Sequence, residues 1–263
     1  MLRCGWGFRC GIVERYYMTD ELREAILNTH NDLRNKIAMG QETRGPQPAA
    51  SNMNILNYNF ELEFIAQCHA NTCNINHDKC RKGLNLAVGQ NLAMESRSKE
   101  IQLEDIMDII VKGIQRWYDE VKDFNTDEVD RFTRSQGVGH YTQIVWADIE
   151  YIGCGFIIWH NYKWYTLYLV CNYGGTKTGG NLRNTAIYKK GEVCSKCSTE
   201  KSCNDKYKGL CGQVIPISEV YRGIYGRSST LKFVTIFGAN VKQQDLSVCL
   251  VITIWCLFTK LLL

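Results

Sequence analysis

The sequence predicts an α+β fold in which helices pack in layers against a sheet. Three segments with helical spacing of apolar residues fill the first half of the chain, and two strand-like segments follow after residue 150. Helices that precede strands, rather than alternating with them, are not typical of a doubly wound parallel sheet. With 263 residues, 45% of them hydrophobic, the chain is long enough to bury one sizeable core.

The first helix is predicted to begin after Thr19 and to end at Gly40. Thr19 is a good amino-terminal cap, and the acidic side chains of Asp20 and Glu21 suit the positive end of the helix dipole. The apolar positions that recur at helical spacing are Leu22, Ile26, Leu27, Leu33 and Ile37. Residues 44–48 contain two prolines, so this segment is predicted to be a loop.

Two further helices are predicted before residue 125. Residues 59–72 place apolar and small side chains on one broad face, and residues 101–124 form the longest helical pattern, with apolar side chains at intervals of three and four. The segment between them, residues 74–91, is predicted to be irregular and contains two glycines.

Two strands are predicted in the second half of the chain, at residues 151–159 and 164–173, joined by the short segment 160–163. Residues 189–212 then form a compact segment that carries four cysteines. Residues 213–247 show no clear periodicity and are predicted to be a linker or disordered.

Cysteine is the strongest compositional signal. The chain contains 13 cysteines, which is more typical of an oxidising compartment than of the cytosol. A zinc site is the alternative for the last group, because Cys194 and Cys197 have CxxC spacing and Cys203 and Cys211 follow. The second pair is eight residues apart instead of three, so the spacing favours disulfides.

Charge and the two ends of the chain narrow the choice of partner and location. The formal net charge is +4 and no dense block of Lys and Arg occurs, so nucleic acid is not an expected partner. Residues 1–17 lack an apolar run long enough for a signal peptide. An upstream start, an incorrectly assigned start and an unusual export route all remain open.

The carboxyl-terminal end, residues 248–263, is apolar but short for a membrane span. It is interpreted as a membrane anchor, as a lipid-anchor signal or as a tail outside the fold. A membrane is expected as a partner only if this tail anchors the protein.

Two histidines and one acid are the candidates for chemistry. The chain lacks the H-E-x-x-H, G-x-S-x-G, phosphate-binding and dinucleotide-binding motifs. His77, His140 and Glu120 could together hold a divalent metal or hydrogen-bond a ligand. The alternative gives each an ordinary structural role, with His77 in a turn, His140 in the core and Glu120 at a solvated helix end.

The most informative segments are residues 139–147 (GHYTQIVWA) and 168–175 (YLVCNYGG). They resemble the two signature motifs of the CAP superfamily, which comprises cysteine-rich secretory, antigen 5 and pathogenesis-related proteins. The resemblance is greatest to the arthropod venom-allergen (antigen 5-like) branch and extends from about Thr19 to Gly212. Further matching segments are residues 30–34, 41–45, 70–73, 77–80 and 88–91.

This resemblance implies an α-β-α sandwich with a central cavity lined by two histidines and two acids. By motif, His77 and His140 take the histidine positions, Glu120 takes one acid position, and Gln90 stands at the other. An amide is a poorer cation ligand than a carboxylate, so only a weak site for a divalent cation such as zinc is expected at His77 and His140. Catalysis by paired carboxylates is disfavoured for the same reason, so no catalytic residue is assigned.

The resemblance also implies disulfides. Cys154 is expected to pair with Cys171, and Cys73 and Cys80 with the amino-terminal cysteines, in the order Cys10 and Cys4. The four cysteines that are expected to pair locally, in an order left open, are Cys194, Cys197, Cys203 and Cys211. Cys68 has no evident partner and is expected to be a free buried thiol.

The predicted organisation is a cysteine-bearing segment (1–18), a CAP domain (19–190), a cysteine-rich extension (191–212), a linker (213–247) and an apolar tail (248–263). The expected protein is a secreted monomer without enzymatic activity, which binds a lipid, a sterol or an extracellular protein through its cavity and surface. The alternatives are an extracellular protease-like hydrolase that uses the cavity histidines and a membrane-tethered interaction protein.

Overall fold

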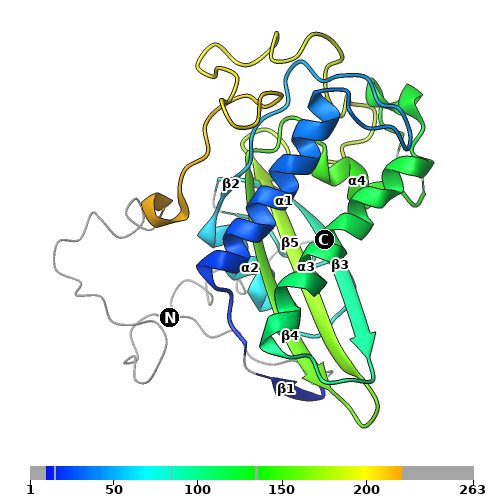
Figure 1. Cartoon of the computed structure of the whole chain (residues 1–263), viewed down its shortest axis with the longest axis vertical. Coiled ribbons are helices and arrows are strands. Elements are labelled where there is room, and N and C mark those ends of the chain that lie inside the picture. The colour runs from blue at the N-terminus through cyan, green and yellow to red at the C-terminus, as the bar shows by residue number, and fades with distance from the viewer. Residues whose placement is uncertain (1–9, 15, 84, 134–135, 221–263) are drawn as a thin grey trace, which may run out of the picture.

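The computed structural model describes residues 10–14, 16–83, 85–133 and 136–220 (Figure 1). Helices and strands alternate irregularly along this part of the chain. In chain order the elements are β1 (Ile12–Glu14), α1 (Asp20–Ala38), β2 (Asn57–Tyr58), α2 (Phe60–Ala70), β3 (Ala87–Arg97), α3 (Leu103–Tyr118), the 3-10 helices η1 (Asp119–Asp123) and η2 (Thr126–Val129), α4 (Gly139–Ile144), β4 (Tyr151–His160) and β5 (Tyr165–Gly175).

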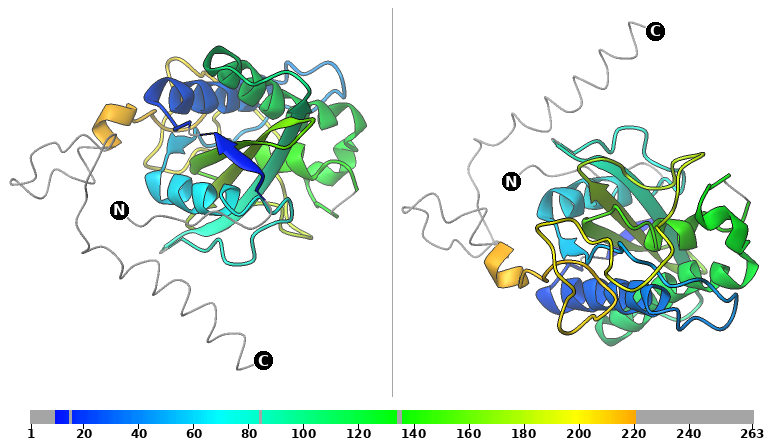
Figure 2. Two further views of the ribbon diagram at one scale, coloured as in Figure 1. Left: turned by 90° about the horizontal axis from the view of Figure 1, so that it is seen from below. Right: turned by 90° about the horizontal axis from the view of Figure 1, so that it is seen from above.

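The strands form one sheet in the order β1-β4-β5-β3, and the short β2 pairs with β4 in parallel. The other pairings are antiparallel. Helices α1 and α3 lie on one face of the sheet and α2 lies on the other (Figures 1 and 2). The predicted α+β fold, in the form of an α-β-α sandwich, is therefore confirmed.

The three predicted helices are present, and the predicted cap of the first is confirmed. Thr19 Oγ1 accepts a hydrogen bond from the backbone N–H of Leu22 at the start of α1, and Asn59 Oδ1 accepts one from Leu62 at the start of α2. These side chains satisfy amide groups that have no partner within the helix. The third helix is shorter than predicted, because after Tyr118 the chain tightens into η1.

Helix α2 approaches β4 so closely that only glycine fits at two strand positions. A Cβ on Gly153 would overlap the backbone of Glu63, and a Cβ on Gly155 would overlap the backbone of Gln67. Because the two glycines have no side chains between helix and strand, polar groups of α2 come within hydrogen-bond distance of the backbone of β4. Gln67 Nε2, for example, donates to the carbonyl oxygen of Phe156 at 2.7 Å.

Two strands escaped the sequence prediction. Strand β3 begins at Ala87, inside the segment predicted to be irregular, and β1 precedes the first predicted element. Gln90 and Asn91 of β3 are buried polar residues whose side chains form hydrogen bonds. The strand therefore lacks the alternation of apolar and polar side chains by which a strand is predicted. Strand β1 has three residues, which is too short to show a period.

Two disulfides implied by the resemblance are present. Cys154 and Cys171 lie directly opposite each other on β4 and β5 and are bonded, and Cys10 is bonded to Cys73. Cys68 is also disulfide-bonded, so the prediction of a free buried thiol is wrong; its side chain is only partly buried and accessible to a partner. Cys80 is disulfide-bonded, and its predicted partner Cys4 lies outside the described residues.

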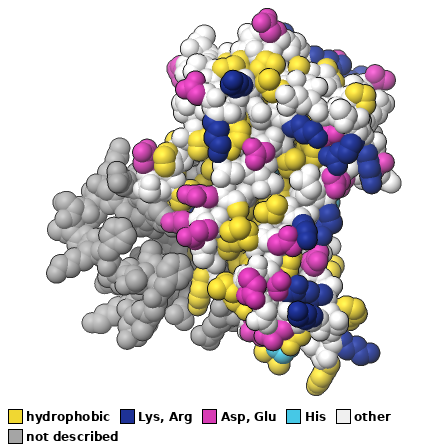
Figure 3. All heavy atoms as spheres, in the orientation of Figure 1, with side chains coloured by type: hydrophobic (Ala, Val, Ile, Leu, Met, Phe, Trp, Pro, Cys, Tyr) yellow, Lys and Arg dark blue, Asp and Glu magenta, His cyan; other side chains and the backbone are white. Residues whose placement is uncertain are grey.

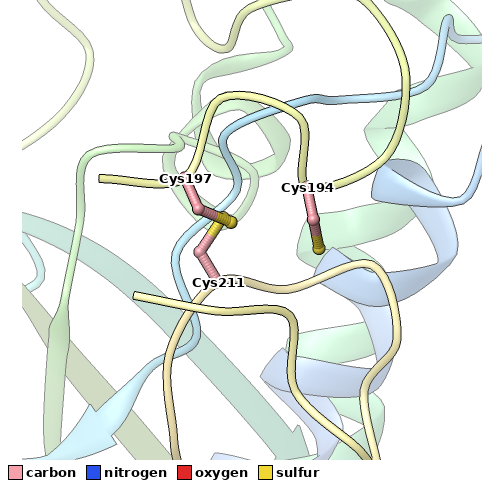
Figure 4. Close-up of side chains that lie close together, drawn as sticks. All are labelled: Cys194, Cys197 and Cys211. Carbon is pink, nitrogen blue, oxygen red and sulfur yellow. A yellow bond between two sulfur atoms is a disulfide. The ribbon is translucent and has the colours of Figure 1, made fainter. Parts of the chain in front are cut away.

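The pairing that the sequence left open is Cys194–Cys203 and Cys197–Cys211. The sulfur atoms of Cys194, Cys197 and Cys211 lie within 4.8 Å of one another, which is close enough to hold a metal ion (Figure 4). All of them are consumed in disulfides, and a zinc site needs thiolates, so the zinc alternative for this segment is wrong. The segment is joined to the main domain, since Lys201 forms an ion pair with Glu150.

Acidic and basic side chains are interspersed on the face that carries α1 and α3, without a continuous basic stripe (Figure 3). In the described ranges no helix is both long and apolar enough to cross a bilayer. The predicted tail at 248–263 lies outside those ranges, as does most of the predicted linker at 213–247.

Candidate ligand-binding cavity

A cavity of about 380 Å³ lies between β3, α4 and the loops that carry His77, Phe132 and Asn181. This volume falls near the lower end of the range of small-molecule sites, which is roughly 300–1,000 Å³. The residues that line it are His77, Arg81, Val88, Gly89, Gln90, Phe132, Gly139, Gln143, Gly180 and Asn181.

Gln90 is held by three hydrogen bonds that use both ends of its amide. Its Oε1 accepts from His77 Nδ1 at 3.1 Å and from the backbone N–H of Asp78 at 3.1 Å, and its Nε2 donates to Asn172 Oδ1 at 3.0 Å. Asn172 lies opposite Gln90 in the pairing of β3 with β5, so the sheet register places this amide pair. Because an amide oxygen only accepts, His77 carries its proton on Nδ1 and presents the lone pair of Nε2.

The environment of His77 favours the neutral imidazole. Burial lowers the pKa of His77, the hydrogen bond to Gln90 opposes this shift, and the nearby charges of Arg81 and His140 lower it further. The ring is therefore uncharged at neutral pH.

Glu120 and His140 form the second polar pair. Glu120 Oε1 accepts from His140 Nδ1 at 2.6 Å, and Oε2 accepts from the backbone N–H groups of His140 and Tyr141 at 2.9 and 3.1 Å. The imidazole also stacks on Trp117, with ring centroids 6.0 Å apart. Both carboxylate oxygens are thus engaged, and the second ring nitrogen of His140, Nε2, is the one that faces away from Glu120.

The structure places the four predicted residues in two groups. His77 and Gln90 line the cavity, whereas Glu120 and His140 lie beside it and reach its wall through the adjacent Gly139.

The donor atoms that remain for a metal are few. Gln90 Oε1 and both oxygens of Glu120 already accept hydrogen bonds, which leaves the Nε2 atoms of His77 and His140. Two imidazole nitrogens fall short of the three or four protein ligands of ordinary zinc sites. The residues therefore fit a weak cation site at most.

Sequence reasoning missed Arg81, Phe132 and Asn172. Arg81 and Phe132 lie in loops, where a charged or apolar side chain carries no periodic signal. Asn172 becomes a partner of Gln90 only through the register of β3 with β5, and β3 itself was not predicted. A histidine four residues before Arg81 is the single local feature that could have directed attention to it.

These features define a class of protein in which disulfides hold an α-β-α sandwich around a small polar cavity. Residues 27–173 match the CAP family, the cysteine-rich secretory protein family. The match spans more than half of the chain and includes β3, α4, β4 and most of β5. The chain therefore belongs to the CAP family.

Within the family, the chain is similar to venom allergens of Dolichovespula and Vespula. It is 43% identical over 186 residues to venom allergen 5 of Dolichovespula arenaria, which covers 69% of this chain and 88% of the relative. It is 45% identical over 186 residues to venom allergen 5.01 of Dolichovespula maculata, with 69% and 78% of the two chains covered.

Solved structures share the fold. The crystal structure of NaASP2 with Zn2+ superimposes with a TM-score of 0.60 at 32% identity, over 74% of this chain and 97% of NaASP2. The structure of BmVAL-1 has a TM-score of 0.63 at 26% identity, over 81% of this chain and 100% of BmVAL-1.

Proposed function

We propose that this CAP protein of the venom-allergen type is secreted and binds a small amphipathic ligand in its cavity without chemical conversion. The observation that carries the proposal is the cavity of about 380 Å³, which combines the apolar side chains of Val88 and Phe132 with the hydrogen-bonded His77 and Gln90. Apolar contact together with a few fixed polar groups is what a site for an amphipathic ligand needs, and Val88 and Phe132 supply the apolar contact here. The disulfides and the family membership support export.

The lining argues for binding rather than bond cleavage. None of the residues that line the cavity in the described part of the chain is Ser, Thr or Cys, so the wall supplies no nucleophile of those types. Glu120 accepts three hydrogen bonds and is thereby committed to positioning His140. The remaining bases are two imidazoles without an acid partner that faces the cavity.

The size of the cavity favours a ligand smaller than a complete membrane lipid. A medium-chain aliphatic amphiphile suits a volume near the lower end of the usual range. Sterols are a second class of amphipathic ligand, and the titration below includes one. A weak divalent cation site at His77 and His140 belongs to the same proposal, and the zinc named for NaASP2 supports it.

The test is calorimetric titration of the protein with 1-octanol, octanoate and a soluble sterol, in parallel with a variant whose cavity is filled. Gly139 is suitable for this variant, because a Cβ there has no neighbour within 4 Å and the residue lines the cavity. Gly139→Leu is expected to abolish saturable binding of at least one amphiphile that the wild type binds. Absence of saturable binding to the wild type would contradict the proposal.

The alternatives have their own readouts. Hydrolysis of a peptide library that disappears in the His77→Ala/His140→Ala variant would establish the protease-like alternative. Recovery of the protein from a membrane pellet rather than from the medium would establish the tethered one. A protein partner that binds the Gly139→Leu variant as well as the wild type would place recognition on the outer surface.

A further inference from the structure

The described wall of the cavity carries a positive charge that no acidic side chain of the wall balances. Arg81 lines the cavity, and no Asp or Glu is among the described residues that do. The other polar wall groups are the neutral amides of Gln90, Gln143 and Asn181 and the imidazole of His77. A concave site with one fixed cation among neutral polar groups favours a ligand that carries a negative charge.

The guanidinium group of Arg81 is held by neutral partners. Its Nε donates to the carbonyl oxygen of Val88 at 3.1 Å and its Nη1 donates to the carbonyl oxygen of Asp78. These bonds fix the planar group against the wall, and no carboxylate of the described chain lies within ion-pair distance of it. The group is thus oriented without being neutralised.

Nearby acids do not cancel this charge. The side chain of Asp78 accepts a hydrogen bond from the backbone N–H of Cys80 and does not line the cavity. Glu120 is engaged by His140 and Tyr141. Burial lowers the pKa of Arg81 and Asp78 raises it, which indicates that the cation is desolvated more than it is compensated.

We infer that the cavity selects small organic anions, specifically amphiphiles with a carboxylate headgroup that pairs with Arg81 while the apolar part contacts Val88 and Phe132. The inference rests on the proposed function, because it assigns the headgroup of the ligand of the same cavity. A carboxylate matches the planar donor arrangement of a guanidinium better than a neutral hydroxyl does.

The test compares octanoate with 1-octanol, which has the same chain length and no charge, by titration calorimetry of the full chain with its disulfides intact. A chelator is present, so that a metal cannot bridge protein and carboxylate. Octanoate is expected to bind the wild type at least about tenfold more tightly than 1-octanol, the size of one charge-assisted hydrogen bond. Arg81→Gln is expected to weaken octanoate about tenfold and to leave 1-octanol within about twofold.

Two controls keep the result specific to the cavity. Arg116→Gln removes the same charge from the surface, where Arg116 pairs with Glu95, and is expected to leave both affinities unchanged. Arg81→Lys retains the charge and is expected to keep most of the selectivity. If Arg81→Gln does not fold, Gln90→Glu, which adds a negative charge to the wall, is expected to weaken octanoate selectively.

The outcomes separate the two proposals. The selection of anions would be overturned if the wild type bound octanoate and 1-octanol with equal affinity. It would also be overturned if neither Arg81→Gln nor Gln90→Glu changed the affinity for octanoate. Either result would leave the binding function standing. No binding of any amphiphile would overturn both. Selective octanoate binding that Arg116→Gln weakens as much as Arg81→Gln would place the selectivity in the net charge of the protein rather than in the cavity.

Discussion

Gln90 shows how a single amide shapes the cavity. Its oxygen accepts two hydrogen bonds and its nitrogen donates one to Asn172 Oδ1, so all three partners match an amide. A carboxylate at this position would retain the two acceptor roles but would face Asn172 Oδ1 without a proton to donate. The amide adds no charge to the wall, so Arg81 is the charged group among the described residues that line it.

The first prediction concerns cation binding at this residue. Gln90→Glu is expected to increase the affinity for zinc by at least about tenfold, because it adds a charged ligand beside His77. Zinc titration by calorimetry at pH 7 measures the change. Gln41→Glu, on the exposed surface, is the matched control and is expected to have no effect. Equal affinity of wild type and Gln90→Glu would contradict a cation site at this part of the wall.

The second prediction concerns His30, which is fully buried. Its Nδ1 lies 2.8 Å from the carbonyl oxygen of Ile26 and its Nε2 lies 2.8 Å from the hydroxyl of Tyr173. Burial lowers the pKa of His30 from 6.5 to about 4, against a smaller opposing effect of the hydrogen bond to Ile26. In the unfolded chain the imidazole binds its proton near pH 6.5.

Because the folded pKa lies below the unfolded one, the unfolded state binds more protons between pH 6.5 and about 4, and stability falls as the pH falls through this window. The loss from this group is expected to reach about 3 kcal/mol at pH 4. Urea unfolding across this range measures it. His30→Gln is expected to remove this part of the pH dependence, and an unchanged slope in the variant would contradict the assignment.

At the scale of elements, the contact between α2 and β4 depends on two glycines of the strand. Gly155→Ala is expected to destabilise the protein by roughly 1–3 kcal/mol, because its Cβ would overlap the backbone of Gln67 in α2. Gly113→Ala in α3 is the control, since the nearest atom to its Cβ is 3.6 Å away and alanine favours a helix. Denaturant unfolding of both variants gives the comparison, and equal stabilities would contradict the close packing of α2 on β4.

The same scale shows which elements the sequence could predict. Helix α1 follows from its cap and apolar spacing, α2 follows from apolar spacing, and β4 and β5 follow from long apolar runs. Strand β3 could not be predicted, because its central residues are buried through side-chain hydrogen bonds whose partners lie on β5 and α4. The end of α3 could not be placed because the apolar pattern continues into η1, where Val121 is buried.

At the scale of the whole molecule, disulfides connect segments that are distant in sequence. Cys10–Cys73 closes 63 residues and Cys194–Cys203 closes 9. In the loop-entropy description these closures stabilise the fold by about 4 and about 3 kcal/mol. Cys10→Ala/Cys73→Ala is therefore expected to lower the free energy of unfolding more than Cys194→Ala/Cys203→Ala. Denaturant unfolding measures this order, and the reverse order would contradict it.

The candidate site was predictable only in part. The family motifs indicated His77, Gln90, Glu120 and His140, and the structure assigns their hydrogen bonds. The cation of the wall, Arg81, comes from a loop whose position depends on the tertiary fold. The shape and the charge of a cavity are properties of the folded molecule, and local sequence patterns do not encode them.

The most direct test of the central claim is to locate the ligand in solution. Amide chemical shifts of the isotopically labelled protein, recorded during titration with octanoate, report where binding occurs. Saturable shifts are expected at Gly89, Gly139 and Gly180, which line the cavity, and not at Gly113, which lies on α3. Shifts confined to the outer surface, or no saturable shift at these three glycines, would contradict the assignment of the cavity as the binding site.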